Sequence, residues 1–170
     1  MASWARQNLM GSSDNLSQSE ISVAINDQMP KYAFDYFKRE YNSELREKNV
    51  LFLGISYRGD VGDTRSTPVA LLYDLFISHG CNLTLHDPYI KFWEEKNESV
   101  HQSMEEIVDM DFDIVVISAG HSIYKSQEFL DQIFHQRDLF IFDTIGHLKE
   151  EDIRILNTVN IVKVLGRGDI

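Results

Sequence analysis

Apolar residues follow two alternating patterns along the chain after residue 48. Five short runs, rich in β-branched and aromatic residues, are typical of strands buried on both faces of a sheet. They cover residues 49–55, 82–86, 113–118, 139–143 and 161–165. Four stretches with helical spacing lie between them, at residues 68–79, 103–110, 126–136 and 149–157. Because strands alternate with helices, we expect a three-layer α/β/α, Rossmann-like fold with a parallel sheet of about five strands.

The first part of the chain shows a different pattern, with apolar residues recurring every three or four positions. This spacing predicts a helix over residues 21–45, in which Pro30 either begins a new helix or kinks a longer one. Its aromatic members, Phe34, Phe37 and Tyr41, would form a large apolar patch if they faced water. We therefore expect this stripe to pack against another copy of the chain.

A long loop, residues 54–67, joins the first predicted strand to the first predicted helix. It contains three glycines and two arginines, and ends in Ser-Thr before Pro68. Glycines allow tight turns or close approach to a ligand, arginines pair with phosphate or carboxylate, and Ser66 or Thr67 before proline resembles a helix N-cap. An anion could therefore bind at this helix start. The alternative is a surface loop with solvated charges, and the spacing alone does not decide between the two.

Composition narrows the classes of partner. With 170 residues, 43% of them hydrophobic, the chain can bury one sizeable core. The net charge of -11 argues against nucleic acid or an anionic membrane as a partner. The sequence has no long apolar run and no signal-peptide pattern, and Cys81 is its single cysteine, so we expect a reducing, cytoplasmic location. The six histidines lack the spacing of a metal site.

Residues that follow the strands are the candidates for ligand contact, because doubly wound sheets bind ligands beyond the carboxyl ends of their strands. Asp87 follows the second strand, either as a ribose-binding acid or, as is more typical of Asp-Pro, at the start of a turn. His121 follows the third strand and either touches a ligand or simply leaves the strand. We expect His86 to be a packed strand residue and Cys81 a small buried one.

The sequence Gly-x-Ser-Tyr-Arg-x-Asp-x-x-Asp-Thr-Arg-x-x-Pro at residues 54–68 resembles the loop that opens the C-terminal domain of UDP-glucose/GDP-mannose dehydrogenases. Arg58 stands where that family usually has lysine, and Thr67 where it usually has serine. The second change keeps a hydroxyl at the helix start, whereas the first replaces an ammonium by a planar guanidinium. Residues 25–30, Ile-Asn-Asp-Gln-Met-Pro, resemble the start of the family's long central helix. Shorter resemblances follow the later strands, at residues 87–88, 118–121, 142–144 and 165–168.

The resemblance implies a domain organisation and an activity. Enzymes of this family have an N-terminal NAD-binding domain, a central helical domain with a catalytic cysteine, and a C-terminal domain that binds the nucleotide of a UDP-sugar. They oxidise the C6 alcohol of the sugar to a carboxylate in two NAD-dependent steps. Residues 1–47 are similar to the end of the central helical domain, and residues 48–170 to the UDP-binding domain. The family's cysteine motif, Gly-Gly-x-Cys-x-Pro-Lys-Asp, is absent from this sequence.

The resemblance therefore implies UDP or a UDP-sugar as the ligand, with no catalytic residue and no cofactor site in this chain. It also implies a homodimer through the N-terminal helix, and a catalytic half that is either a separate chain or missing. The implied substrate-binding residues are Tyr57, Arg58, Arg65, Asp87 and His121. We expect Arg65 to matter most, since its guanidinium can pair with a phosphate or hold the loop against Asp63.

Two functions from other classes remain open. The first is a stand-alone NAD-dependent oxidoreductase, although Gly54, Gly59 and Gly62 lack the Gly-x-Gly-x-x-Gly spacing of a dinucleotide loop. The second is a structural module, in which the aromatic helix forms a dimer and the sheet binds nothing. Whether the chain is an enzyme by itself thus stays undecided by the sequence.

Overall fold

The computed structural model describes residues 13–134 and 136–167. Its centre is a five-stranded sheet with the strand order β2-β1-β5-β6-β7. The strands are β1 (Asn49–Leu53), β2 (Asn82–His86), β5 (Ile114–Ile117), β6 (Phe140–Asp143) and β7 (Ile161–Val164). Every neighbouring pair in this sheet is parallel. The Rossmann-like fold expected from the alternation of strands and helices is therefore confirmed.

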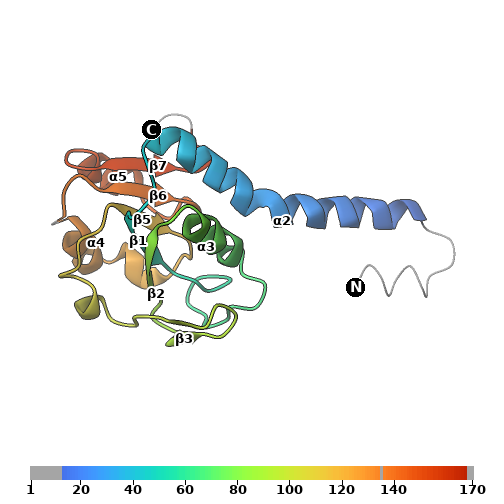
Figure 1. The fold of residues 1–170 in the computed structure, drawn as a ribbon, viewed down its shortest axis with the longest axis horizontal. Helices are drawn as coiled ribbons and strands as arrows, with labels where there is room; N and C mark the ends of the chain where they lie inside the picture. The colour runs from blue at the N-terminus through green and yellow to red at the C-terminus, as the bar shows by residue number, and fades with distance from the viewer. Residues whose placement is uncertain (1–12, 135, 168–170) are drawn as a thin grey trace.

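Helices cover both faces of this sheet, as Figure 1 shows. The α-helices are α2 (Ser13–Tyr41), α3 (Val69–Ser78), α4 (Gln127–Phe134) and α5 (Glu150–Leu156). Alternate strand residues face opposite sides, so Phe52 and Phe142 pack with α2 and α3, whereas Leu53 and Ile117 pack with α4 and α5. The result is three layers with one apolar core on each face of the sheet.

Two short segments differ from the predicted elements. The helix expected over residues 103–110 is wrong, since only a 3-10 turn, η1 (Met104–Glu106), forms there. Met104 in this turn and Ile107 just after it are both buried and three positions apart, a spacing that one 3-10 turn satisfies without a longer helix. Three further short elements were not predicted: the hairpin strands β3 (Phe92–Trp93) and β4 (Glu98–Ser99), and the 3-10 turn η2 (Ser122–Lys125).

The aromatic stripe of α2 is buried within its own chain. The Phe37 ring lies 4.9 Å from that of Phe76 in α3 and 5.5 Å from that of Phe142 in β6, measured between ring centroids. Tyr41 lies edge-on against Phe140 of β6 at 5.2 Å. The prediction that Phe34, Phe37 and Tyr41 pack against another copy is therefore wrong. The sheet face that carries the β6 phenylalanines needs an apolar cover, and α2 supplies it.

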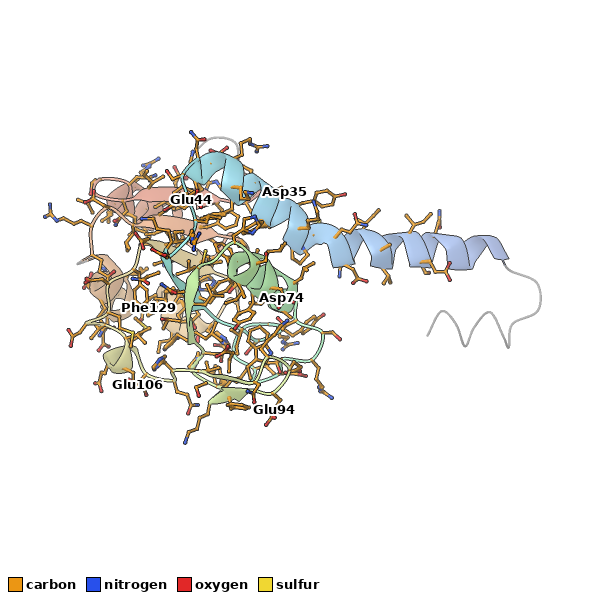
Figure 2. The ribbon with its side chains drawn as sticks, in the orientation of Figure 1. Asp35, Glu44, Asp74, Glu94, Glu106 and Phe129 are labelled. Atoms are coloured by element: carbon orange, nitrogen blue, oxygen red, sulfur yellow. The ribbon has the colours of Figure 1, made fainter. Side chains whose placement is uncertain are left out.

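The first half of α2 extends beyond the rest of the molecule (Figure 1). The helix continues through Pro30 and stops before Asn42, whose positive φ of 47° is typical of a residue that ends a helix. In Figure 2, the side chains of this first half project away from the helix, clear of the sheet and its covering helices. Four large apolar side chains of α2 before Pro30 are consequently exposed; they are Ile21, Val23, Ile25 and Met29.

Candidate functional site

The loop between β1 and α3 lies at the carboxyl edge of the sheet and packs tightly on its neighbours. A Cβ atom on Gly59 would lie 2.1 Å from the carbonyl oxygen of Gly120, and one on Gly62 would lie 2.9 Å from that of Tyr89. These glycines thus allow close approach, as their number suggests, but what approaches them is the backbone of the adjacent loops. They fix the shape of the loop.

The buried side chain of Asp87 is hydrogen-bonded to the beginning of this loop. Its Oδ2 atom accepts hydrogen bonds from the backbone nitrogens of Ile55 and Ser56, at 3.0 and 3.1 Å, and from the Ser56 hydroxyl at 2.7 Å. Its Oδ1 atom accepts from the backbone nitrogen of Tyr89 at 3.0 Å, which is the Asp-Pro turn considered from the sequence. Burial raises the pKa of Asp87, but hydrogen bonds led by that from His121 outweigh it, and the pKa lies below its ordinary value. The carboxylate is therefore ionised and engaged by the protein itself.

His121 connects the same loop to β5 and to Asp87. Its Nε2 atom lies 3.0 Å from Oδ2 of Asp87, and its Nδ1 atom accepts a hydrogen bond from the backbone nitrogen of Asp60 at 2.9 Å. The Asp60 carboxylate in turn accepts from the backbone nitrogen and hydroxyl of Ser122, at 2.8 and 3.0 Å. Those contacts, the backbone one first, lower the pKa of Asp60. His121 and Asp87 are both fully buried, so in this structure they shape the loop from inside.

Arg65 folds back onto Asp63 and forms a bidentate pair. Its Nε and Nη2 atoms donate to the two carboxylate oxygens at 3.0 and 2.8 Å. Mainly because of these side-chain hydrogen bonds, the pKa of Asp63 falls to about 2. This is one of the two roles considered for Arg65, that of holding the loop against Asp63.

The β3–β4 hairpin supports the loop from its outer side. The Thr64 hydroxyl lies 2.8 and 3.0 Å from the two carboxylate oxygens of Glu95, between β3 and β4. The hairpin is anchored on α3, where Tyr73 donates to Glu98 at 2.7 Å and Lys96 pairs with Asp74 at 2.6 Å. The loop is therefore held by three neighbouring segments at once.

A groove of about 800 Å³ stays open between this loop, the start of α3 and α2. Among the described residues, the Arg58 guanidinium forms no ion pair or side-chain hydrogen bond, and Tyr57 beside it is 61% exposed. The groove is lined by Asn26, Asp27, Met29, Pro30, Tyr57, Arg58, Ser66, Thr67, Pro68, Ala70 and Leu71. It thus presents an aromatic ring and an unpaired cation from the loop, and a carboxylate and an amide from α2.

The start of α3 offers less to an anion than its sequence suggests. The Thr67 hydroxyl accepts a hydrogen bond from the Val69 nitrogen at 3.3 Å, and its carbonyl oxygen accepts from the Ala70 nitrogen at 3.3 Å. The cap position of α3 is Pro68, and Thr67 before it occupies two backbone donors that an anion would otherwise use. The binding of an anionic ligand in the groove would therefore depend mainly on Arg58.

An apolar hollow of about 150 Å³ adjoins the groove and shares Met29, Pro30 and Pro68 with it. Ser118 and Thr144, which follow β5 and β6, are among the residues that line it. Both hollows thus lie beyond the carboxyl ends of the strands, with α2 as their common wall. The sequence analysis did not propose these α2 and strand-end residues as ligand contacts, although residues 25–30, 118–121 and 142–144 carried a family resemblance.

The structure brings only part of the predicted set together. Tyr57 and Arg58 line the groove, whereas Arg65 points to solvent with its guanidinium on Asp63, and Asp87 and His121 lie beneath the loop. Direct contact of those three residues with a ligand stays a prediction.

His86 and Cys81 have the packed positions expected for them. His86 is fully buried with Nδ1 2.9 Å from the Tyr124 hydroxyl, and burial lowers its pKa to about 4. Cys81 donates to the carbonyl oxygen of Leu45, and burial raises its pKa to about 11. Over residues 13–134 and 136–167 we find neither a cluster of metal-ligating side chains nor a helix that is long and apolar enough to cross a membrane.

Comparisons with known proteins agree on one family. The model of the UDP-glucose/GDP-mannose dehydrogenase family, UDP binding domain, matches residues 51–150. The chain is similar to the UDP-N-acetyl-D-mannosamine dehydrogenase of Methanococcus aeolicus, with 28% identity, 94% of this chain and 36% of the relative covered. The corresponding enzyme of Pyrococcus horikoshii is 25% identical, with 95% and 36% covered. The chain thus spans about a third of the length of these curated relatives.

Solved structures show the same relation. The UDP-N-acetyl-mannosamine dehydrogenase Cap5O of Staphylococcus aureus superposes with a TM-score of 0.61 at 27% identity, with 82% of this chain and 31% of that one covered. An NDP-N-acetyl-D-galactosaminuronic acid dehydrogenase from Methanosarcina mazei Go1 has the same fold, with a TM-score of 0.74 at 22% identity, over 94% of this chain and 33% of that one.

Proposed function

The chain belongs to the UDP-glucose/GDP-mannose dehydrogenase family, and from this we propose that it is the nucleotide-binding part of a nucleotide-sugar 6-dehydrogenase. In this proposal, residues 48–170 bind UDP or a UDP-sugar, and residues 1–47 are the end of the central helical domain. The oxidation itself, with NAD, requires the domains that the family carries in addition to this one. We expect the chain alone to be catalytically inactive. We also expect the protein to be located in the cytoplasm.

The unpaired Arg58 in the groove is the observation that carries the proposal. A UDP-sugar presents a pyrophosphate and a planar base, and a guanidinium can bind phosphate oxygens in bidentate fashion. The exposed ring of Tyr57 offers a face on which a base can stack. Because the chain has a net charge of -11 and the groove also contains Asp27, the attraction for phosphate must be local to Arg58.

The structure gives less support to a dinucleotide site at the usual place. In a doubly wound sheet, that crevice opens where the strand order reverses, here between β1 and β5. Asp60, Gly120 and the buried His121 fill the space between the loops that follow these strands. Asp87, which would bind the ribose, has both oxygens engaged by protein donors. A nucleotide in the open groove is therefore the better supported reading.

A homodimer through α2 is the second part of the proposal. With Phe34 and Phe37 buried, the surface available to a partner lies nearer the start of the helix. Ile21, Ile25, Met29 and Tyr32 are spaced by four, four and three residues, which places them on one side, and each is about half exposed. We propose this stripe, rather than the aromatic one, as the contact between copies.

Calorimetric titration of the chain with UDP, with NAD and with buffer tests the nucleotide site. We expect UDP to bind and NAD not to, and Arg58→Ala to weaken UDP binding about tenfold or more, the effect of losing a charge-assisted hydrogen bond of roughly 1.5–3 kcal/mol. Arg58→Lys should recover only part of this loss. Arg154→Ala, which removes an exposed arginine from α5, is the matched control. Binding of NAD but not UDP, or unchanged UDP affinity in Arg58→Ala, would overturn the proposal.

The same samples test the catalytic part. We expect no reduction of NAD by the purified chain with any UDP-sugar, because its single cysteine is buried at the opposite end of the sheet from the groove. Turnover by the pure chain would contradict this expectation and favour the oxidoreductase reading.

A further inference from the structure

The imidazole of His121 joins three loops that lie far apart in the sequence. It follows β5, its Nδ1 atom faces the loop after β1 at Asp60, and its Nε2 atom faces the end of β2 at Asp87. The ring is fully buried, with the rings of Tyr89 and Tyr124 at 5.3 and 5.4 Å between centroids. No solvent molecule is needed to satisfy either nitrogen.

The partners of the two nitrogens fix the position of the ring proton. A backbone N–H can only donate, so Nδ1, which faces the N–H of Asp60, must be the unprotonated acceptor. The proton is therefore on Nε2, which donates it to the carboxylate of Asp87. His121 thus accepts on one side and donates on the other, a combination that few side chains provide across this distance.

These two contacts hold both ends of the segment that carries Tyr57 and Arg58. On one side, the backbone nitrogens of Ile55 and Ser56 donate to Asp87. On the other side, the backbone nitrogen of Asp60 donates to His121. His121 and Asp87 are also hydrogen-bonded to each other. Residues 56–60 therefore form an arch, both ends of which are attached to this one buried pair.

We propose that His121 is a positioning residue of the nucleotide site, which sets the direction of Arg58 without touching the ligand. This inference rests on the proposed function. The imidazole fixes the backbone two residues after Arg58, where Gly59 is already pressed against Gly120. An anchored arch presents the guanidinium in one direction, so less conformational entropy is lost when a phosphate binds.

Three substitutions separate the two hydrogen bonds of the ring. His121→Phe keeps its bulk and removes both, His121→Asn keeps an acceptor near Nδ1, and His121→Gln keeps a donor near Nε2. We expect UDP affinity to fall about tenfold in His121→Phe, and by less in His121→Asn, which still holds Asp60. Cys81→Ala is the matched control: this residue is also buried, but it lies at the opposite end of the sheet from the arch, so UDP affinity should not change.

A double-mutant cycle tests whether His121 acts through Arg58. If it does, adding His121→Phe to Arg58→Ala should weaken UDP binding little further, because the side chain being positioned is already gone. Additive losses, or wild-type affinity in a folded His121→Phe, would overturn the proposal. If His121→Phe does not fold, the Asn and Gln variants in the same two backgrounds decide.

Hydrogen exchange at the Asp60 amide measures whether its hydrogen bond to His121 is formed, and it needs no nucleotide. The measurement therefore separates this inference from the proposed function. We expect protection in the wild type and in His121→Asn, and loss of protection in His121→Phe and His121→Gln. Should UDP not bind the wild type at all, the nucleotide proposal fails while this pattern still reports on the arch. An Asp60 amide that is equally protected in all four proteins would overturn the role of His121.

Discussion

Arg65 and Arg58 show how neighbouring arginines of one loop can have different chemical roles. Arg65 is paired in bidentate fashion with Asp63 two residues before it, and this contact fixes the turn that leads into α3. Arg58 has no such partner among the described residues and faces the groove. A charge already neutralised nearby attracts a ligand less than a free one, so we assign the phosphate contact to Arg58.

The Asp63–Arg65 pair has a predictable pH dependence. The pKa of the Asp63 carboxyl is lowered from 3.8 to about 2 in the folded chain, so the ionised, paired form is favoured by folding. The stabilisation is fully present above the unfolded pKa of about 4 and is lost as the pH falls towards 2. We expect Arg65→Ala to raise the Asp63 pKa towards its ordinary value, because the side-chain hydrogen bonds are the largest cause of the shift, as measured by carboxyl carbon NMR shifts during a titration.

Arg154→Ala serves as the control for this titration, because Arg154 pairs with Glu150 on α5 and contacts no residue of the loop. A pKa that remains near 2 in Arg65→Ala would show that the backbone nitrogen of Arg65, which also donates to Asp63, is sufficient on its own.

At the scale of elements, α2 combines a buried half and an exposed half in one helix. Phe37 is fully buried and surrounded by the rings of Phe34, Phe76, Phe140 and Phe142. We expect Phe37→Ala to lower the free energy of unfolding by about 3–5 kcal/mol, as is usual when a phenylalanine is removed from a core. Urea denaturation monitored by circular dichroism measures this change.

Val23→Ala is the control, since Val23 is an apolar residue of the same helix that is 59% exposed and lies outside the stripe proposed as the contact between copies. Its effect should stay within about 0.5 kcal/mol. If the two substitutions cost the same, the docking of α2 on the sheet would be contradicted.

The strands could be predicted closely from the sequence, whereas the surroundings of α2 could not. Each strand of the large sheet is a short apolar run between polar turns, a signal that is local in the chain. The aromatic stripe of α2 indicated burial, but periodicity does not say against which surface a face is buried. The β3–β4 hairpin was missed because two-residue strands, one of them Glu98–Ser99, carry no such pattern.

The candidate site shows the same limit. Sequence reasoning placed Asp87 and His121 at the carboxyl edge of the sheet, which follows from the alternation of strands and helices. It could not show that the two side chains bond to each other beneath the loop, because that contact depends on how the strands are ordered in the sheet. The groove wall supplied by α2 was missed because it depends on how this helix packs on α3 and the sheet.

At the scale of the whole molecule, the exposed stripe of α2 predicts self-association. Burying Ile21 and Ile25 against a second copy removes apolar surface from water. We expect sedimentation equilibrium to show a dimer at tens of micromolar, and Ile21→Glu with Ile25→Glu to yield monomers of unchanged thermal stability. Ser22→Glu, which adds charge at an exposed neighbouring position, should leave the dimer intact. A wild type that stays monomeric at this concentration would remove the stripe from the proposal.

The packing of Phe37 against Phe140 also has a consequence for biosynthesis. The two rings belong to residues that are more than a hundred positions apart, so α2 leaves the ribosome long before the strand that covers it. At about 5–20 residues per second, the interval is roughly 5 to 20 s. During this time α3 is the only early partner of the aromatic face among the contacts described, and the sheet side of that face stays open. The aromatic face of α2 therefore stays without its cover from β6 until that strand is made.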